Sequence, residues 1–458
     1  MSARIGNQVD FFVIKARSRL VITIIVIAVL FSLAILMPNQ MLLAADGVNY
    51  ERSIRALNEE GVLSTYPGLF FQPAGYPLLI WLFSIFGLIP SFFVILSLQI
   101  CLYAYSVNFL VNRIEKTFIK PVGSTLFVFL IFNPILCISA INCGYESIAT
   151  SISMLILGIL VSKNRLRSIE ISSLSSLLTV LIFMNTKFIA LAIFVTFYVF
   201  ITQPMVRKQT GAILFFALCV TLPIVSLTIR NYVSVGISSP AINSGVTLNW
   251  GAGFDASGAH NIYGAFGVAC PEITGSETRI MGKNEIVSTF FNFTDANTPA
   301  AVAKYDRVLR DCVIKWYAQN PSELSRLFFY KTLYFFSPFT GPISTGTFEI
   351  NNIIIERINA NLQQATSNEV ERRILSSIYL LFSLAILFLC LNGFRKISRL
   401  NVRLASLLGG LVVIQWAISA FTIGDNRFRI PAVPIFIFLA IVGLTNVKTE
   451  LKSSKLGS

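Results

Sequence analysis

The sequence is poor in charged side chains, which make up 13% of its 458 residues, whereas 55% of the residues are hydrophobic. The mean hydropathy is +0.72. A soluble protein of this length needs more polar surface than that. Uncharged apolar runs of about 18 residues or more are typical of membrane spans. The chain is therefore predicted to be an all-α polytopic membrane protein, with its first apolar run kept as an anchor because it is too long for a signal peptide.

Two further absences narrow the function. The chain has one histidine, and its seven cysteines lack the spacing of a metal cluster, so no metal cluster is predicted. The apolar runs hold almost no ionisable side chains, whereas coupled transporters bury such groups at mid-membrane. A transporter or a flippase of lipid-linked sugars is thereby disfavoured.

The net charge of +14 follows from the distribution of lysine and arginine between the two sides of a membrane. If the N-terminus is cytoplasmic, the basic clusters in the short loops all face the cytoplasm, as does the C-terminus. The charge therefore indicates topology, and no nucleic-acid partner is expected. Ten runs are predicted to span: 20–37, 91–111, 122–141, 146–162, 170–185, 187–203, 211–229, 374–392, 403–422 and 429–446.

The same charges decide how the apolar run 74–89 is interpreted. If this run crossed the membrane, the basic loops after it would face outward, so it is predicted to be a short re-entrant or interfacial helix on the outer side. Pro77 and Pro90 flank it, which suits a broken helix. The predicted regions are an N-terminal transmembrane module 1–229 with the first outer loop at 38–90, a large extracytoplasmic loop 230–373, C-terminal transmembrane helices 374–446 and a cytoplasmic tail 447–458.

The first outer loop is expected to contain an amphipathic helix between residues 49 and 58. Tyr50, Ile54 and Leu57 recur at helical spacing, and charged residues take the other face. Such a helix is predicted to lie on a membrane surface with its apolar face down. Asp46 stands just ahead of it, either as a functional carboxylate or as its cap.

The large outer loop is predicted to have two parts. Residues 230–297 are rich in Gly, Ser and Asn and show no sustained periodicity. Helix signals then mark the ranges 299–319 and 322–336, and the second, aromatic helix is placed in the outer leaflet. Cys270 and Cys312 both fall in this loop, where an oxidising exterior allows them to pair.

Polar side chains from separate loops are predicted to meet at the outer membrane face. Two carboxylates with several cations suit glycosyl transfer from a lipid phosphate, since a carboxylate can take a proton from an incoming hydroxyl and cations can hold the leaving phosphate. An enzyme working outside the cytoplasm must receive its sugar on a lipid. The predicted group comprises Asp46, Glu146, Lys187, Arg230, Asp425, Arg427 and Arg429.

Each of these residues has a structural alternative. Glu146 can cap the following span, and Lys187 can extend its amine to the interface from a span end. Arg427 and Arg429 can be interfacial anchors. The aromatic residues of 322–336 can pack among themselves instead of forming a lipid groove.

Four stretches of the chain resemble the GT-C glycosyltransferases that use polyprenyl-phosphate sugars, a superfamily that includes protein mannosyltransferases and lipid A aminoarabinose transferases. The first stretch holds Asp46, Tyr50, Ala56 and Gly61 and continues into QPAGYPLLI. The others are IRNYVSVGISSPAINSGVTLNWGAGFDASGAH from Ile229, WYAQNPSELSRLFFYKTLYFFSP from Trp316, and DNRFRIPAVPIF from Asp425.

This resemblance implies an inverting enzyme of the plasma (inner) membrane with an extracytoplasmic active site. It implies that Asp46 is the catalytic carboxylate and Glu146 a second acidic residue. Arg427 and Arg429 are expected to contact the donor phosphate. Lys187 and Arg230 are further candidates for this contact because they are predicted to lie at the same membrane face. A divalent cation near the first-loop acid is left open. The acceptor is expected to be a glycan or glycolipid, and the alternative is a polysaccharide polymerase or ligase. Tyr50, Tyr76 and Asn249 are the substrate-loop candidates.

Overall fold

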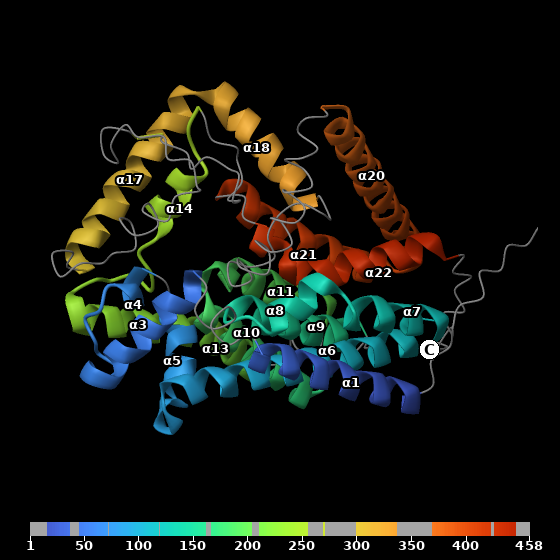
Figure 1. Cartoon of the computed structure of the whole chain (residues 1–458), viewed down its shortest axis with the longest axis horizontal. Coiled ribbons are helices and arrows are strands. Elements are labelled where there is room, and N and C mark those ends of the chain that lie inside the picture. The colour runs from blue at the N-terminus through green and yellow to red at the C-terminus, as the bar shows by residue number, and fades with distance from the viewer. Residues whose placement is uncertain are drawn as a thin grey trace, which may run out of the picture.

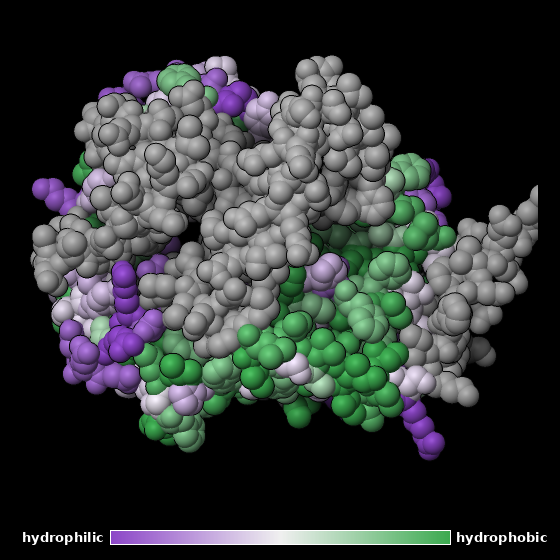
Figure 2. All heavy atoms as spheres, viewed as in Figure 1, coloured by the Kyte–Doolittle hydropathy of each residue, from purple (hydrophilic) through white to green (hydrophobic). Residues whose placement is uncertain are grey.

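The computed structural model describes residues 16–36, 45–71, 73–118, 120–161, 166–203, 210–254, 269–270, 299–336, 369–422 and 426–445. Within these ranges every regular element is helical, and no strand occurs. Apolar helices form a bundle, over which α17 and α18 form an arch with α14 beneath α17 (Figure 1). The apolar surface of the bundle contrasts with hydrophilic side chains around α3 and at the junction of α17 and α18 (Figure 2). The protein is a helical membrane protein.

Each run predicted to span is helical, as one helix or as two consecutive ones, but only some of these helices are long and apolar enough to cross a membrane. Four pass by length and composition in the described residues, and the pair α7–α8, bent by 53°, makes a possible fifth. Ten spans are thus not confirmed. The four helices are α1 (Ala16–Leu36), α6 (Leu88–Thr117), α13 (Thr210–Val235) and α21 (Val402–Phe421), and the bent pair is α7 (Lys120–Ile131) with α8 (Pro134–Ala140).

The remaining helices of the bundle are shorter or only partly described. Three are apolar but contain 17 residues or fewer, and η4 continues into α22 as a fourth short apolar segment. They are α9 (Tyr145–Val161), α10 (Ser168–Met184), η2 (Thr186–Phe188) leading into α11 (Ile189–Thr202), η4 (Asn426–Ala432) and α22 (Val433–Leu444), beside the long α20 (Glu369–Leu400).

The run 74–89 forms broken helix, as its prolines predict. It contains α5 (Gly75–Trp81) and the single turn η1 (Ser84–Phe86), after which α6 begins at Leu88. Pro77 lies in the first turn of α5 and Pro90 in the first turn of α6, where a missing N–H costs no helical hydrogen bond. Seven residues of α5 are far too few to span a membrane.

The first-loop helix is α3 (Ala45–Glu60), and it begins earlier than predicted, so that Asp46 is its second residue. Tyr50, Ile54 and Leu57 are buried, as the periodicity indicates. The prediction that this face lies on the membrane surface is wrong, because the face packs against α4 (Gly68–Phe71), α5 and α6. The short helices of the same loop, and not the membrane, supply apolar surface that covers this face of α3.

The predicted large outer loop contains α14 (Ser244–Trp250), α17 (Pro299–Gln319) and α18 (Pro321–Phe336), here called the outer unit, and α17 and α18 match the predicted ranges closely. The region without periodicity nevertheless contains α14. Asp306 of α17 explains this helix, because its buried carboxylate accepts hydrogen bonds from the N–H groups of Gly245 (2.7 Å) and Val246 (3.0 Å) and from the Ser244 hydroxyl (3.0 Å). These bonds satisfy donors at the start of α14.

Candidate functional site

The first loop meets the start of α9 through two tyrosines. The rings of Tyr50 in α3 and Tyr76 in α5 lie 4.9 Å apart between centroids, and both side chains are buried. Burial raises the pKa of the Tyr76 phenol well above its ordinary value, and Cys143, Tyr50 and Glu146 nearby raise it further. Tyr76 therefore stays protonated beside the Glu146 carboxyl group.

Gln99 of α6 forms hydrogen bonds with both α5 and the turn before α9. Its Oε1 accepts a hydrogen bond from the Tyr76 hydroxyl at 2.6 Å, and its Nε2 donates to the carbonyl oxygen of Asn142 at 2.8 Å. Asn142 belongs to the turn just before α9. One buried amide thus holds α5 and the turn that precedes Glu146 against the same helix.

Glu146 is the second residue of α9 and is only 3% exposed. Its carboxylate folds back over Gly144, where an added Cβ would lie 2.5 Å from Oε2. A carboxylate in the first turn interacts favourably with the helix dipole, as the capping alternative expects. The burial and the neighbouring Tyr76 place the same carboxylate at the contact between α9 and the first loop, so the two roles are compatible.

Lys187 lies in an aromatic cage at the turn between α10 and α11. Its Nζ donates to the Tyr145 hydroxyl at 2.7 Å and lies 4.7 Å from the Tyr145 ring centroid, 5.3 Å from that of Phe188 and 4.0 Å from that of Phe428. Cation–π contacts of this kind stabilise an ammonium group in a partly desolvated place. Because Tyr145 precedes Glu146 and Phe428 belongs to η4, the cage joins three of the predicted loops.

The predicted arginines at the end of the chain lie in η4. Arg429 is buried, and its neighbour Phe428 covers Lys187. Arg427 is the second residue of η4, and its side chain lies outside the described residues, as does that of Asp46. Asp46 stands one helical turn before Tyr50 on α3, about 6 Å along the helix axis. Asp425 also lies outside the described residues.

Arg230 contacts the backbone of the first outer loop. Its Nε donates to the carbonyl oxygen of Val62 (2.9 Å), and its terminal nitrogens donate to those of Ser64 (3.0 Å) and Leu69 (3.4 Å). Its guanidinium also lies 4.7 Å from the ring centroid of Phe70. These contacts indicate that Arg230 holds the loop, while the predicted contact with a donor phosphate stays a prediction.

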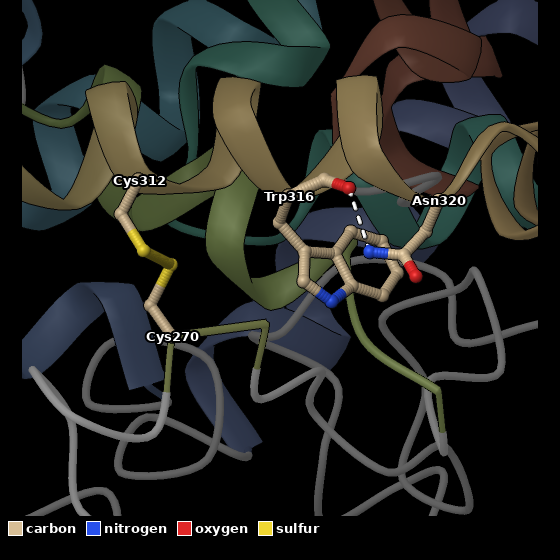
Figure 3. Close-up of a disulfide and its surroundings, with 4 residues drawn as sticks. All are labelled: Cys270, Cys312, Trp316 and Asn320. Carbon is tan, nitrogen blue, oxygen red and sulfur yellow. Dashed lines mark hydrogen bonds between the residues drawn. A yellow bond between two sulfur atoms is a disulfide. The ribbon is translucent and has the colours of Figure 1, made fainter.

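The large loop is tied together by a disulfide between Cys270 and Cys312, the pair predicted from their shared loop (Figure 3). Cys312 belongs to α17, in which Trp316 follows one turn later and packs in the same apolar cluster. Asn249 is buried in α14, which packs on α17. Its predicted contact with substrate is not tested by this position.

The contacts bring together Tyr50, Tyr76, Glu146, Lys187 and the η4 turn. Tyr145, Phe428 and Gln99 are not among the predicted site residues, although the first two stand next to predicted residues. The described residues contain no group of three or more His, Cys, Asp or Glu side chains that could hold a metal ion. The arrangement presents a buried carboxylate beside a protonated phenol and a caged ammonium group, which suits proton transfer next to a bound anion.

Comparison with known proteins found no matching family model, no similar curated protein and no similar solved structure.

Proposed function

We propose that the protein is an integral-membrane glycosyltransferase that moves a sugar from a polyprenyl-phosphate carrier to a glycan or glycolipid acceptor outside the cytoplasm. The observation that carries the proposal is the chain of contacts from Tyr50 and Tyr76 through Glu146 and Tyr145 to Lys187 and Phe428. It connects the acidic first loop with the basic η4 turn, as an acid–base reaction at a phosphate requires.

In this proposal Asp46 is the general base that accepts the proton of the acceptor hydroxyl as the oxygen attacks the anomeric carbon. The bond from that carbon to the phosphate oxygen breaks with inversion, and the polyprenyl phosphate leaves. Arg427, Arg429 and Lys187 stabilise the leaving phosphate, and Glu146 supports the acid–base site. The Cys270–Cys312 disulfide supports an extracytoplasmic outer loop, because such bonds persist in oxidising compartments.

The test compares cell-envelope glycans, by mass spectrometry, in a strain that lacks the gene and in strains complemented with variants. We expect the wild type to restore a sugar-bearing product and Asp46→Asn to lower its rate of formation by about 100-fold or more, the usual contribution of a general base. Glu59→Gln is the matched control, since Glu59 lies on the exposed face of the same helix. If Asp46→Asn forms product as fast as Glu59→Gln at equal protein levels, Asp46 is not the base. A polymerase, which needs no acid at this position, would give that result.

A further inference from the structure

A small pocket lies inside the bundle between α9, α21 and the segment formed by η4 and α22. Its walls are mostly apolar, and two polar side chains from different helices contribute to its lining. Ser153 of α9 and Gln415 of α21 supply the polar groups, and Leu157, Leu191, Pro431 and Pro434 are among the apolar residues. The pocket is about the size of one water molecule.

The polar groups of this pocket lack protein partners within the described part of the chain. Gln415 is 2% exposed, and neither its Oε1 nor its Nε2 makes a hydrogen bond there; the Ser153 hydroxyl makes none either. An amide can donate two hydrogen bonds and accept two, and burying it without any is unfavourable. Gln99 shows the usual situation, because both ends of its buried amide are bonded.

The walls restrict what can bind. Among the described residues no charged side chain lines the pocket, so an ion would lack a counter-charge. Pro431 and Pro434 have no N–H group, so the backbone there offers acceptors more readily than donors. The size excludes a sugar or a lipid headgroup. A small neutral molecule that both donates and accepts hydrogen bonds fits these conditions.

We propose that this pocket binds a water molecule that bridges Gln415 and Ser153 and so ties α9 to α21 next to the η4–α22 segment. Ser153 lies eight residues after Tyr145 on α9, about 12 Å along the helix from the aromatic cage. Pro431 lies three residues after Phe428, whose ring contacts Lys187. The water therefore joins α9 and α21 beside the segment that carries Phe428 into the cage, whether or not the protein is a glycosyltransferase.

The experiment measures the apparent Tm of the full chain in detergent for Gln415→Met, Ser153→Ala and the double variant. If a water bridges the two side chains, each single variant lowers Tm by about 2 °C or more, and the double variant loses clearly less than the sum. Strictly additive shifts overturn the proposal. So does a rise in Tm for Gln415→Met, because methionine in place of a truly unpartnered amide removes a desolvation cost.

Two controls calibrate these shifts. Gln99→Met removes a buried amide that is fully bonded and sets the size of the loss expected for a satisfied group. Ser406→Ala changes an exposed hydroxyl on α21 that bonds only to its own helix, and it should leave Tm unchanged. If Gln415→Met does not fold, an experimental structure at a resolution that shows ordered water decides: density between Gln415 and Ser153 supports the proposal, and an empty pocket overturns it.

Discussion

Replacing Arg230 with lysine separates two roles for this side chain, because it keeps the positive charge and removes the planar set of donors. In the structure the guanidinium reaches the backbone carbonyl oxygens of Val62 and Ser64, in the loop between α3 and α4, and of Leu69 in α4. A lysine ammonium is a single point and cannot reach acceptors spaced in this way. The loop should lose order in Arg230→Lys, although the charge is unchanged.

The magnitude follows from the bonds that lysine cannot replace. Two of the three carbonyl contacts are short, at 2.9 and 3.0 Å, and hydrogen bonds to charged groups contribute about 1.5–3 kcal/mol each. If lysine keeps one of these two bonds, the loop loses about 1.5–3 kcal/mol of local stability. Amide hydrogen exchange at residues 64–71 should then become roughly 10- to 150-fold faster, since about 1.4 kcal/mol corresponds to a factor of ten.

The assay is hydrogen exchange followed by mass spectrometry on the protein in detergent, with Arg55→Lys as the matched control. Arg55 lies on α3, its side chain is 60% exposed, and its only described ion pair is with Glu51 one turn away. Such a surface pair contributes little, so exchange in this variant should stay at the wild-type rate. A wild-type exchange rate in Arg230→Lys, together with weaker binding of a polyprenyl phosphate, would refute the loop-holding role and restore the phosphate role.

Three further predictions concern stability. Cys270→Ser should lower the apparent Tm and make α17 more susceptible to proteolysis, because the disulfide closes a loop of 42 residues; reductant should have no further effect on the variant. Burial lowers the pKa of Lys331 to about 7 from 10.5, so the folded state binds fewer protons than the unfolded state between these values, and Tm should rise as pH increases from about 7 to about 10; Lys331→Met should flatten that rise. Gly443→Ala should destabilise the crossing of α20 and α22 by about 1–3 kcal/mol, because its Cβ would lie 2.1 Å from the Leu389 carbonyl oxygen; equal Tm values for variant and wild type would contradict this.

Local signals predicted the outer helices and the broken run well. Pro299 and the Asn320–Pro321 pair mark the two ends of α17, because proline is tolerated at the start of a helix and disfavours helical geometry in the residue before it. The buried face of α3 also follows from periodicity. What covers that face does not, since periodicity identifies an apolar surface and leaves open whether lipid or α4 and α5 lie against it.

The contacts of the candidate site were less accessible to sequence reasoning. Arg230 bonds to backbone carbonyl oxygens, which every residue possesses, so no residue type identifies its partners. The cage around Lys187 is built from Tyr145 and Phe428, which lie far apart in the chain and look like ordinary membrane aromatics. Their position next to Glu146 and Arg429 is a usable signal, since a residue beside a predicted site residue is brought to the same place by the fold.

The outer unit also holds the η4 end of the candidate site in place, which gives α17 and α18 a structural role. Lys331 of α18 donates to the carbonyl oxygen of Thr422 at the C-terminal end of α21, where a cation interacts favourably with the helix dipole. Six residues earlier on α21, the Trp416 indole donates to the Thr332 hydroxyl at 3.1 Å. Thr422 is only four residues before Asn426, the first residue of η4. Because Phe71 of α4 packs in the same apolar cluster as Trp316 of α17, the outer unit contacts the first loop as well, so a change in its position would move both ends of the candidate site together.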